Sequence, residues 1–106
     1  MSLPARTAEQ RAEALTAALA SRRARAELRT SLKEGRRSGV DIVVDAESDD
    51  TWHGVRVRWL LESLPGIGPI RAEQILQACA IAPTRRLGGL TVRQRASLVG
   101  ALGGGA

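Results

Sequence analysis

Two glycines, Gly66 and Gly68, stand one residue apart between two stretches with helical periodicity. In the stretch before them, apolar residues recur at intervals of three and four, which indicates the buried face of a helix that Pro65 must end. That face comprises Val57, Leu60, Leu61 and Leu64. The chain therefore has to turn back through a tight hairpin between two helices. Because no segment after Val57 has the alternation typical of a strand, the pattern predicts an all-α fold.

The helix after the glycines is predicted to begin at Pro69, because proline fits the first helical turn, where its missing amide is not needed. This helix should end before Pro83 and bury Ile75, Leu76 and Cys79. Thr91 and Gln94 then have the spacing of a capping box, which opens a last helix. Its inward-facing residues are predicted to be Val92, Ala96, Val99 and Leu102, and a glycine tail, Gly103 to Gly105, follows.

A long helix is predicted for the N-terminal part of the chain. Thr7 and Gln10 form a capping-box signature, and no Gly or Pro interrupts the sequence from there to about Glu34. The apolar stripe of this helix is thin and diluted by alanines, so we expect much of the helix to stand clear of the core. The stripe consists of Leu15, Leu19, Leu28 and Leu32.

Charge is unevenly distributed along the chain. Residues 22–37 carry seven basic residues against two Glu, whereas residues 40–50 carry five acidic residues and no basic one. Ser38 and Asp41 at the start of the acidic segment predict a short capped helix, although three β-branched residues in a row leave a strand fragment open. A polar joint at residues 48–51 predicts two domains: residues 1–50, with the long basic helix and the acidic segment, and residues 51–106, a compact basic helical domain with a glycine-rich tail.

Composition favours a polyanionic partner. The 16 basic residues exceed the 11 acidic ones, the net charge is +5, and all basic residues except Lys33 are Arg. Cys79 is alone, so neither a disulfide nor a cysteine-based zinc site can form within the chain. No run reaches the roughly 20 apolar residues of a membrane span, and no apolar core of signal-peptide length follows the N-terminus. We expect a cytoplasmic monomer with no cofactor, no metal, no membrane contact and no small-molecule substrate.

The hairpin itself predicts a phosphate site. Gly66 and Gly68 can adopt a positive φ and present backbone N–H groups with no side chain in the way, at a helix N-terminus whose dipole favours an anion. Arg71 can add a charge-assisted hydrogen bond, and Ile67 should turn back between the helices. The alternative is a simple corner whose glycines serve only the turn. The predicted contact residues here are Gly66, Ile67, Gly68, Pro69, Ile70 and Arg71.

The segment from Leu64 to Ile75 resembles the helix-hairpin-helix family and the related helix-two-turns-helix domain, which bind duplex DNA or RNA through that hairpin. Over almost the whole chain, the order of motifs resembles the actinobacterial integration host factor family. The matching features are the Leu3-Pro4 start, Glu9-Gln10-Arg11, the Arg-rich helix, the run 60–68, Arg71-Ala72, Gln74-Ile75 and the run 85–90.

This resemblance implies a small all-helical, nucleoid-associated protein that binds duplex DNA with little sequence preference, deforms it and supports site-specific recombination. It implies that the hairpin and the Arg85-Arg86 loop touch phosphates, while the long helix supplies a second basic surface. We include Arg93 of the basic C-terminal part and, from the long helix, Arg22, Arg23, Arg25 and Arg29. Pro69 and the acidic segment depart from the family pattern and suggest a lower affinity.

Enzymatic activity is not expected, because no Lys or Asp follows Asp50 to serve as nucleophile, base or metal ligand. His53 is expected to be an exposed or capping residue. Trp52 and Trp59 lie seven residues apart, on one helix face if the helix begins that early, and core packing is their expected role. The alternative function is an RNA-binding or ribosome-associated protein, which duplex DNA and duplex RNA in competition would separate.

Overall fold

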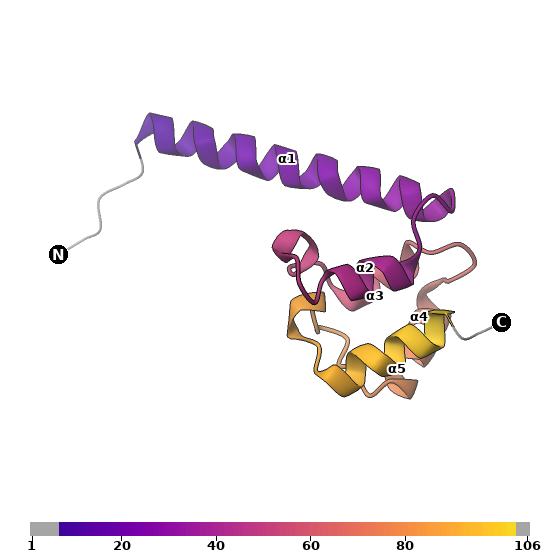
Figure 1. The fold of residues 1–106 in the computed structure, drawn as a ribbon. Coiled ribbons are helices and arrows are strands. Elements are labelled where there is room, and N and C mark those ends of the chain that lie inside the picture. The colour runs from indigo at the N-terminus through magenta and orange to yellow at the C-terminus, as the bar shows by residue number, and fades with distance from the viewer. Residues whose placement is uncertain (1–6, 104–106) are drawn as a thin grey trace.

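The structure of the protein, a computed structural model, describes residues 7–103. Within these residues, five α-helices and two short 3-10 turns follow one another (Figure 1). They are α1 (Ala8–Lys33), α2 (Gly39–Asp45), η1 (Asp50–Trp52), α3 (Val57–Glu62), α4 (Pro69–Ala78), η2 (Leu87–Gly89) and α5 (Val92–Gly103). The described residues contain no strand, so the predicted all-α fold is confirmed. The predicted Leu3-Pro4 start and the tail residues 104–105 lie outside the described residues.

Helix α1 is held by its C-terminal half only. The capping box is present: the Thr7 hydroxyl accepts from the Gln10 N–H, and the Gln10 side chain accepts from the Thr7 N–H. Leu28 and Leu32 are buried in the core, whereas Leu15, nearer the N-terminus, is 61% exposed. The first half of α1 therefore extends beyond the body, as Figure 1 shows and the thin apolar stripe predicted.

The acidic segment begins with a helix, and the strand alternative is wrong. The Ser38 hydroxyl accepts from the Asp41 N–H at 3.0 Å and caps α2. Ile42 and Val43 are fully buried, and α2 lies beside α5 (Figure 1). The β-branched residues are helical because burial against α5 outweighs their small intrinsic preference for strands. The predicted joint at residues 48–51 leads into η1, which Asp49 caps.

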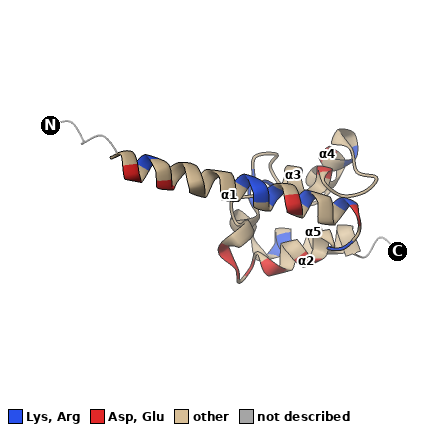
Figure 2. Ribbon diagram, turned by 90° about the horizontal axis from the view of Figure 1, so that it is seen from above, with Lys and Arg blue, Asp and Glu red and all other residues tan. Residues whose placement is uncertain are grey.

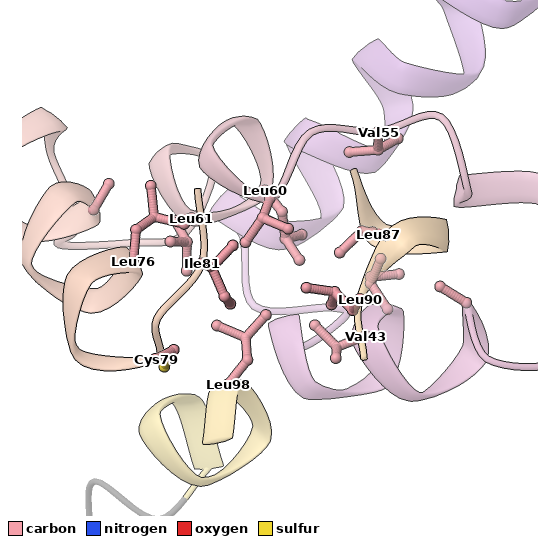
Figure 3. Close-up of a cluster of buried hydrophobic side chains, with 14 of the residues drawn as sticks. Val43, Val55, Leu60, Leu61, Leu76, Cys79, Ile81, Leu87, Leu90 and Leu98 are labelled. Carbon is pink, nitrogen blue, oxygen red and sulfur yellow. The ribbon is translucent and has the colours of Figure 1, made fainter. Parts of the chain in front are cut away.

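The core lies where α3, α4 and the 79–90 segment meet α2 and α5. Leu60 and Leu61 of α3 and Leu76 of α4 are fully buried in it (Figure 3). Leu98 of α5 closes the cluster from the opposite side (Figure 3). The domain boundary at residue 50 stays a prediction, and this one core includes residues from both sides of it. No helix of the described residues is long and apolar enough to cross a membrane.

The inward face of α5 differs from the predicted one. Its capping box is present between Thr91 and Gln94, and Val99 and Leu102 are partly buried as predicted. However, Val92 is 85% exposed, Ala96 is exposed, and the fully buried residue is Leu98. The buried face includes an arginine, which a search for apolar periodicity does not count. Arg95 lies one turn before Leu98 and donates to the Val43 carbonyl at 2.8 Å and to the Leu87 carbonyl.

The two tryptophans do not share a helix face, because α3 begins only at Val57. Trp52 belongs to η1 and Trp59 to α3, and both are partly buried against the core, which was their predicted role. His53 is likewise half-buried rather than exposed, and its Nε2 hydrogen-bonds to the carbonyl of Ala46 at the C-terminus of α2. It therefore ties the acidic segment to the loop before α3, which fits the predicted capping role.

The face that α5 turns inward can be tested by a matched pair of substitutions. Leu98→Ala should lower the free energy of unfolding by about 2–5 kcal/mol, because it leaves a cavity in a closed core. Val92→Ala should change it by less than about 0.5 kcal/mol, because that side chain is exposed. Urea denaturation measures both. Similar losses for the two variants would contradict the arrangement of α5 described here.

Candidate nucleic-acid interface

The hairpin between α3 and α4 presents unpaired backbone donors. The N–H groups of Gly66, Gly68, Ile70 and Arg71 have no hydrogen-bond acceptor within residues 7–103. Three of these belong to the cap and first turn of α4, whose amides have no acceptor inside the helix. Pro69 occupies the first helical position, as predicted. The free N–H groups and the helix dipole together favour an anion at this end of α4.

The two hairpin glycines differ in backbone conformation. Gly66 has a φ of +76°, in the left-handed region that disfavours side chains. Gly68 has a φ of −97°, which any residue adopts, so the prediction of a positive φ at both glycines is wrong for Gly68. A Cβ atom at Gly68 would meet no other atom of the described protein within 4 Å. The turn therefore requires glycine at position 66. At position 68 a side chain would fit the fold, and it would affect only what approaches the hairpin from solvent.

A groove of about 480 Å³, which we call the hairpin groove, runs beside these donors. It is lined by Gly66, Ile67 and Arg71 of the hairpin region, and by Arg37 from the turn before α2. Ile67 is partly buried against the core, as predicted. Arg71 has no ion-pair partner among the described residues, whereas Arg37 lies 3.5 Å from Asp45. One unpaired guanidinium therefore stands at the edge of the groove, within the predicted phosphate site.

Two further predicted hairpin residues face solvent. Ile70 is 78% exposed and Pro69 is also exposed, so neither contributes to the core. An apolar side chain beside free N–H groups can make a packing contact with the sugar of a nucleic-acid backbone. Arg93 is exposed on the first turn of α5, and it lines neither the hairpin groove nor the pockets around the 84–89 loop.

The predicted Arg85-Arg86 loop lies beside α1 and the stretch before α3. Arg86 donates to the carbonyl of Gly54 and lines a pocket with Arg25 of α1. Arg85 donates to the carbonyl of Gly89 at 3.2 Å and remains exposed. The sequence analysis assigned Arg86 to the same basic surface as the hairpin and treated α1 as a second, separate surface. In the structure, Arg86 and Arg25 of α1 line the same pocket.

The predicted arginines of α1 fall into two kinds. Arg22, Arg23 and Arg25 are exposed on the half of α1 that lies over the body, where Figure 2 shows their blue segments. Arg29 is also a structural contact: its guanidinium lies 5.1 Å from the ring centroid of Trp59, and its Nε donates to the Ser63 hydroxyl at 3.3 Å. It therefore pins α1 to α3. The five acidic residues of the segment 40–50 lie on and around α2 and η1, and further acidic residues lie along α1 and on α3 and α4 (Figure 2).

One arginine that the site prediction missed joins this surface. Arg56 lines the same pocket as Arg25 and Arg86. A single antiparallel bridge between residues 56 and 86 holds it there. The charge count included Arg56, but a contact between residues 30 positions apart leaves no periodic signal in the sequence. The short extended stretch before α3, with Val55 and Val57 buried on either side of an exposed Arg56, was the only local indication.

The titratable groups of the described residues have mainly structural surroundings. No group of three or more His, Cys, Asp and Glu residues within 7–103 is arranged to hold a metal ion. Burial raises the pKa of the Cys79 thiol, which keeps it protonated and poorly nucleophilic at neutral pH. The hydrogen bonds from Thr51 lower the pKa of Asp49, so this exposed carboxylate stays ionised as a cap of η1. Cys79 belongs to the hydrophobic core, and Asp49 belongs to the cap of η1.

Comparison with known proteins identifies relatives over nearly the whole chain. The family described as S13-like H2TH domain matches residues 32–102. A protein named integration host factor from Mycobacterium tuberculosis is 50% identical over 93% of this chain and 94% of its own length. A protein of the same name from Streptomyces coelicolor is 44% identical over 92% of each chain. A structure described as sIHF bound to an 8-bp palindromic DNA is 39% identical, with a TM-score of 0.77, over 83% of this chain and 99% of its own.

The different backbone conformations of the two glycines predict opposite effects of the same substitution on stability. Gly66→Thr should lower the free energy of unfolding by about 1–2 kcal/mol, because it forces a β-branched residue into the left-handed region. Gly68→Thr should leave it unchanged or raise it by up to about 1 kcal/mol, because Thr caps a helix at least as well as Gly. Thermal and urea denaturation of both variants measure this difference. A loss at Gly68 as large as at Gly66 would be incompatible with the φ of −97° described here.

Proposed function

The chain belongs to the integration host factor family, and from this membership we propose that it is a non-enzymatic architectural protein that binds duplex DNA through backbone phosphates. One observation carries the proposal. The hairpin holds free N–H groups of Gly66, Gly68, Ile70 and Arg71 in place before any ligand arrives, with no side chain on either glycine to obstruct an approaching backbone. Such a site recognises a phosphate and reads no base, so the protein binds unrelated sequences with similar affinity.

Two basic surfaces support an architectural role. The hairpin groove with Arg71 lies near one end of the body, and Arg22 and Arg23 extend the basic surface along α1. A single duplex that contacts both surfaces has to bend around the protein. Otherwise the two surfaces bind two separate segments of DNA and bridge them. Bending a site of 20–30 bp costs on the order of 1–6 kcal/mol, which several phosphate contacts can offset. The protein therefore compacts DNA and assists recombination reactions that need a bent substrate.

Duplex DNA is a better partner than RNA on the present observations. The relatives are named for host factors of integration, and the solved relative is described as bound to DNA. The basic surface and the family membership support a nucleoid-associated role in the cytoplasm. The relatives, named as integration host factors, support a binding role rather than catalysis.

Binding to unrelated duplexes tests this function directly. The protein should bind several 20–30 bp sequences with dissociation constants within roughly tenfold of one another, and affinity should fall steeply between about 50 and 200 mM salt, because phosphate contacts release counterions. It should also prefer duplex DNA over duplex RNA at the same salt concentration. Fluorescence anisotropy measures all three. The matched variant is Gly68→Thr, which should bind roughly tenfold or more weakly while remaining folded, because its side chain covers the hairpin donors.

Strong preference for one sequence, or equal binding to duplex RNA, would contradict the proposed function. Normal binding by folded Gly68→Thr would show that the hairpin is only a turn.

The basic surface of α1, which includes Arg22 and Arg23, is predicted to be needed for bending DNA. Leu28 and Leu32 belong to the core, so removing α1 would unfold the protein, and charge substitutions are the cleaner test. Arg22→Gln/Arg23→Gln should still bind duplex DNA, with a salt slope smaller by roughly two, but should no longer promote circularisation of short fragments. Arg11→Gln, on the extended part of the same helix, is the control. If the double variant circularises DNA as well as the control does, the hairpin region deforms DNA without α1.

A further inference from the structure

Arg56 and Arg86 are held opposite each other by the backbone. The Val57 N–H donates to the Arg85 carbonyl at 3.0 Å, and the Leu87 N–H donates to the Val55 carbonyl at 2.9 Å. These bonds flank the Arg56–Arg86 bridge on both sides, which makes it an antiparallel pair without hydrogen bonds of its own. This is the closer of the two pairings, with Cα atoms about 4.5 Å apart and both side chains on the same face. The backbone therefore brings two arginine side chains onto one face.

A third arginine reaches the same place from α1. Arg25, Arg56 and Arg86 line one pocket of about 200 Å³, together with Gly54, Val55 and Trp59. We call it the arginine pocket. Its volume equals that of roughly six or seven waters at about 30 Å³ each. Gly54 lies beside two of these guanidinium groups: a Cβ atom built there would lie at an ordinary contact distance of 3.9 Å from Nη2 of Arg25, and its carbonyl accepts from Arg86.

Nothing in the described protein neutralises these three charges. The ion pairs of arginine within residues 7–103 involve Arg36, Arg37 and Arg58, and none involves a member of the arginine pocket. Like charges directly opposite in an antiparallel pair are destabilising, and the third guanidinium adds to the repulsion. All three arginines are exposed, so water and salt screen part of this repulsion, and Val55 and Trp59 line the rest of the pocket. The free protein therefore carries an electrostatic cost that a bound anion would remove.

We propose that the arginine pocket binds one backbone phosphate of the duplex, and that this phosphate bridges α1 and the helical body. The inference rests on the proposed function for the identity of the polyanion, but not for the existence of the site. Guanidinium groups suit this ligand because each can donate two parallel hydrogen bonds to phosphate oxygens. Arg25 belongs to α1, whereas Arg56 and Arg86 belong to the body. A shared phosphate thus makes α1 and the body parts of one DNA-binding surface rather than two independent ones.

The test uses Arg56→Gln and Arg25→Gln, because Arg86 also hydrogen-bonds to Gly54 and its loss would disturb the loop. Each variant should bind a 20–30 bp duplex roughly five- to tenfold more weakly than wild type, with a salt slope smaller by about one. The double variant should lose less than the product of the two single losses, because both side chains hold the same phosphate. Arg11→Gln is the control for general loss of charge, and fluorescence anisotropy is the measurement.

A second measurement separates a binding site from a structural contact. Without DNA, Arg56→Gln should raise the Tm at low salt by more than Arg11→Gln does, because it relieves the repulsion, and this gain should disappear at about 1 M salt. With saturating duplex the order should reverse, and wild type should be the most stabilised. A residue that merely supports the fold would lower the Tm in both conditions.

The outcomes distinguish the two proposals. If the wild-type protein does not bind duplex DNA, the proposed function fails. If wild type binds and Arg56→Gln binds no more weakly than Arg11→Gln, the arginine pocket does not hold a phosphate. Independent effects of Arg25→Gln and Arg56→Gln, equal to their product in the double variant, would overturn the shared phosphate. A lower Tm of DNA-free Arg56→Gln would overturn the electrostatic cost from which the inference is drawn.

Discussion

The arrangement of this protein depends on the burial of two leucines near the end of α1. Leu28 and Leu32 lie in the core, and each buried leucine contributes about 1.5–3 kcal/mol relative to an exposed one. Arg29 between them lies over Trp59 and donates to Ser63, which itself donates to the Trp59 carbonyl. A few residues thus hold a helix of 26 residues at a defined angle to the body. Without them the arginines of α1 would have no defined position relative to the hairpin.

The hairpin illustrates how the proposed phosphate site can be built at little cost to the fold. The first amides of any helix lack internal acceptors, and here they are left toward solvent rather than satisfied by a side-chain cap. A serine or threonine at position 68 would satisfy one of them and would stabilise the helix end. Glycine at that position therefore gives up stability for access. Gly66 has a different role, because its positive φ makes the turn itself.

The sequence predicted what depends on neighbouring residues and missed what depends on distant ones. Capping boxes at Thr7 and Thr91, the helix start at Pro69 and the short helix after Ser38 all follow from spacings of a few residues. The inward face of α5 was misjudged because Arg95 is held by carbonyls of other segments. Arg56 was missed for a similar reason, since its partner across the bridge is 30 positions away.

The acidic segment shows how charge of both signs serves one interface. Its carboxylates lie on the α2 and η1 side, away from the α1 arginines (Figure 2), and Asp45 already pairs with Arg37. A chain with a uniform positive charge would attract DNA to every face, and several orientations would compete. Because one side of this protein repels phosphate, an approaching duplex is steered to the side that carries α1. On the proposed function, the acidic residues lower the total attraction for DNA but favour one orientation of the protein on it, which an architectural protein needs in order to bend DNA in a defined direction.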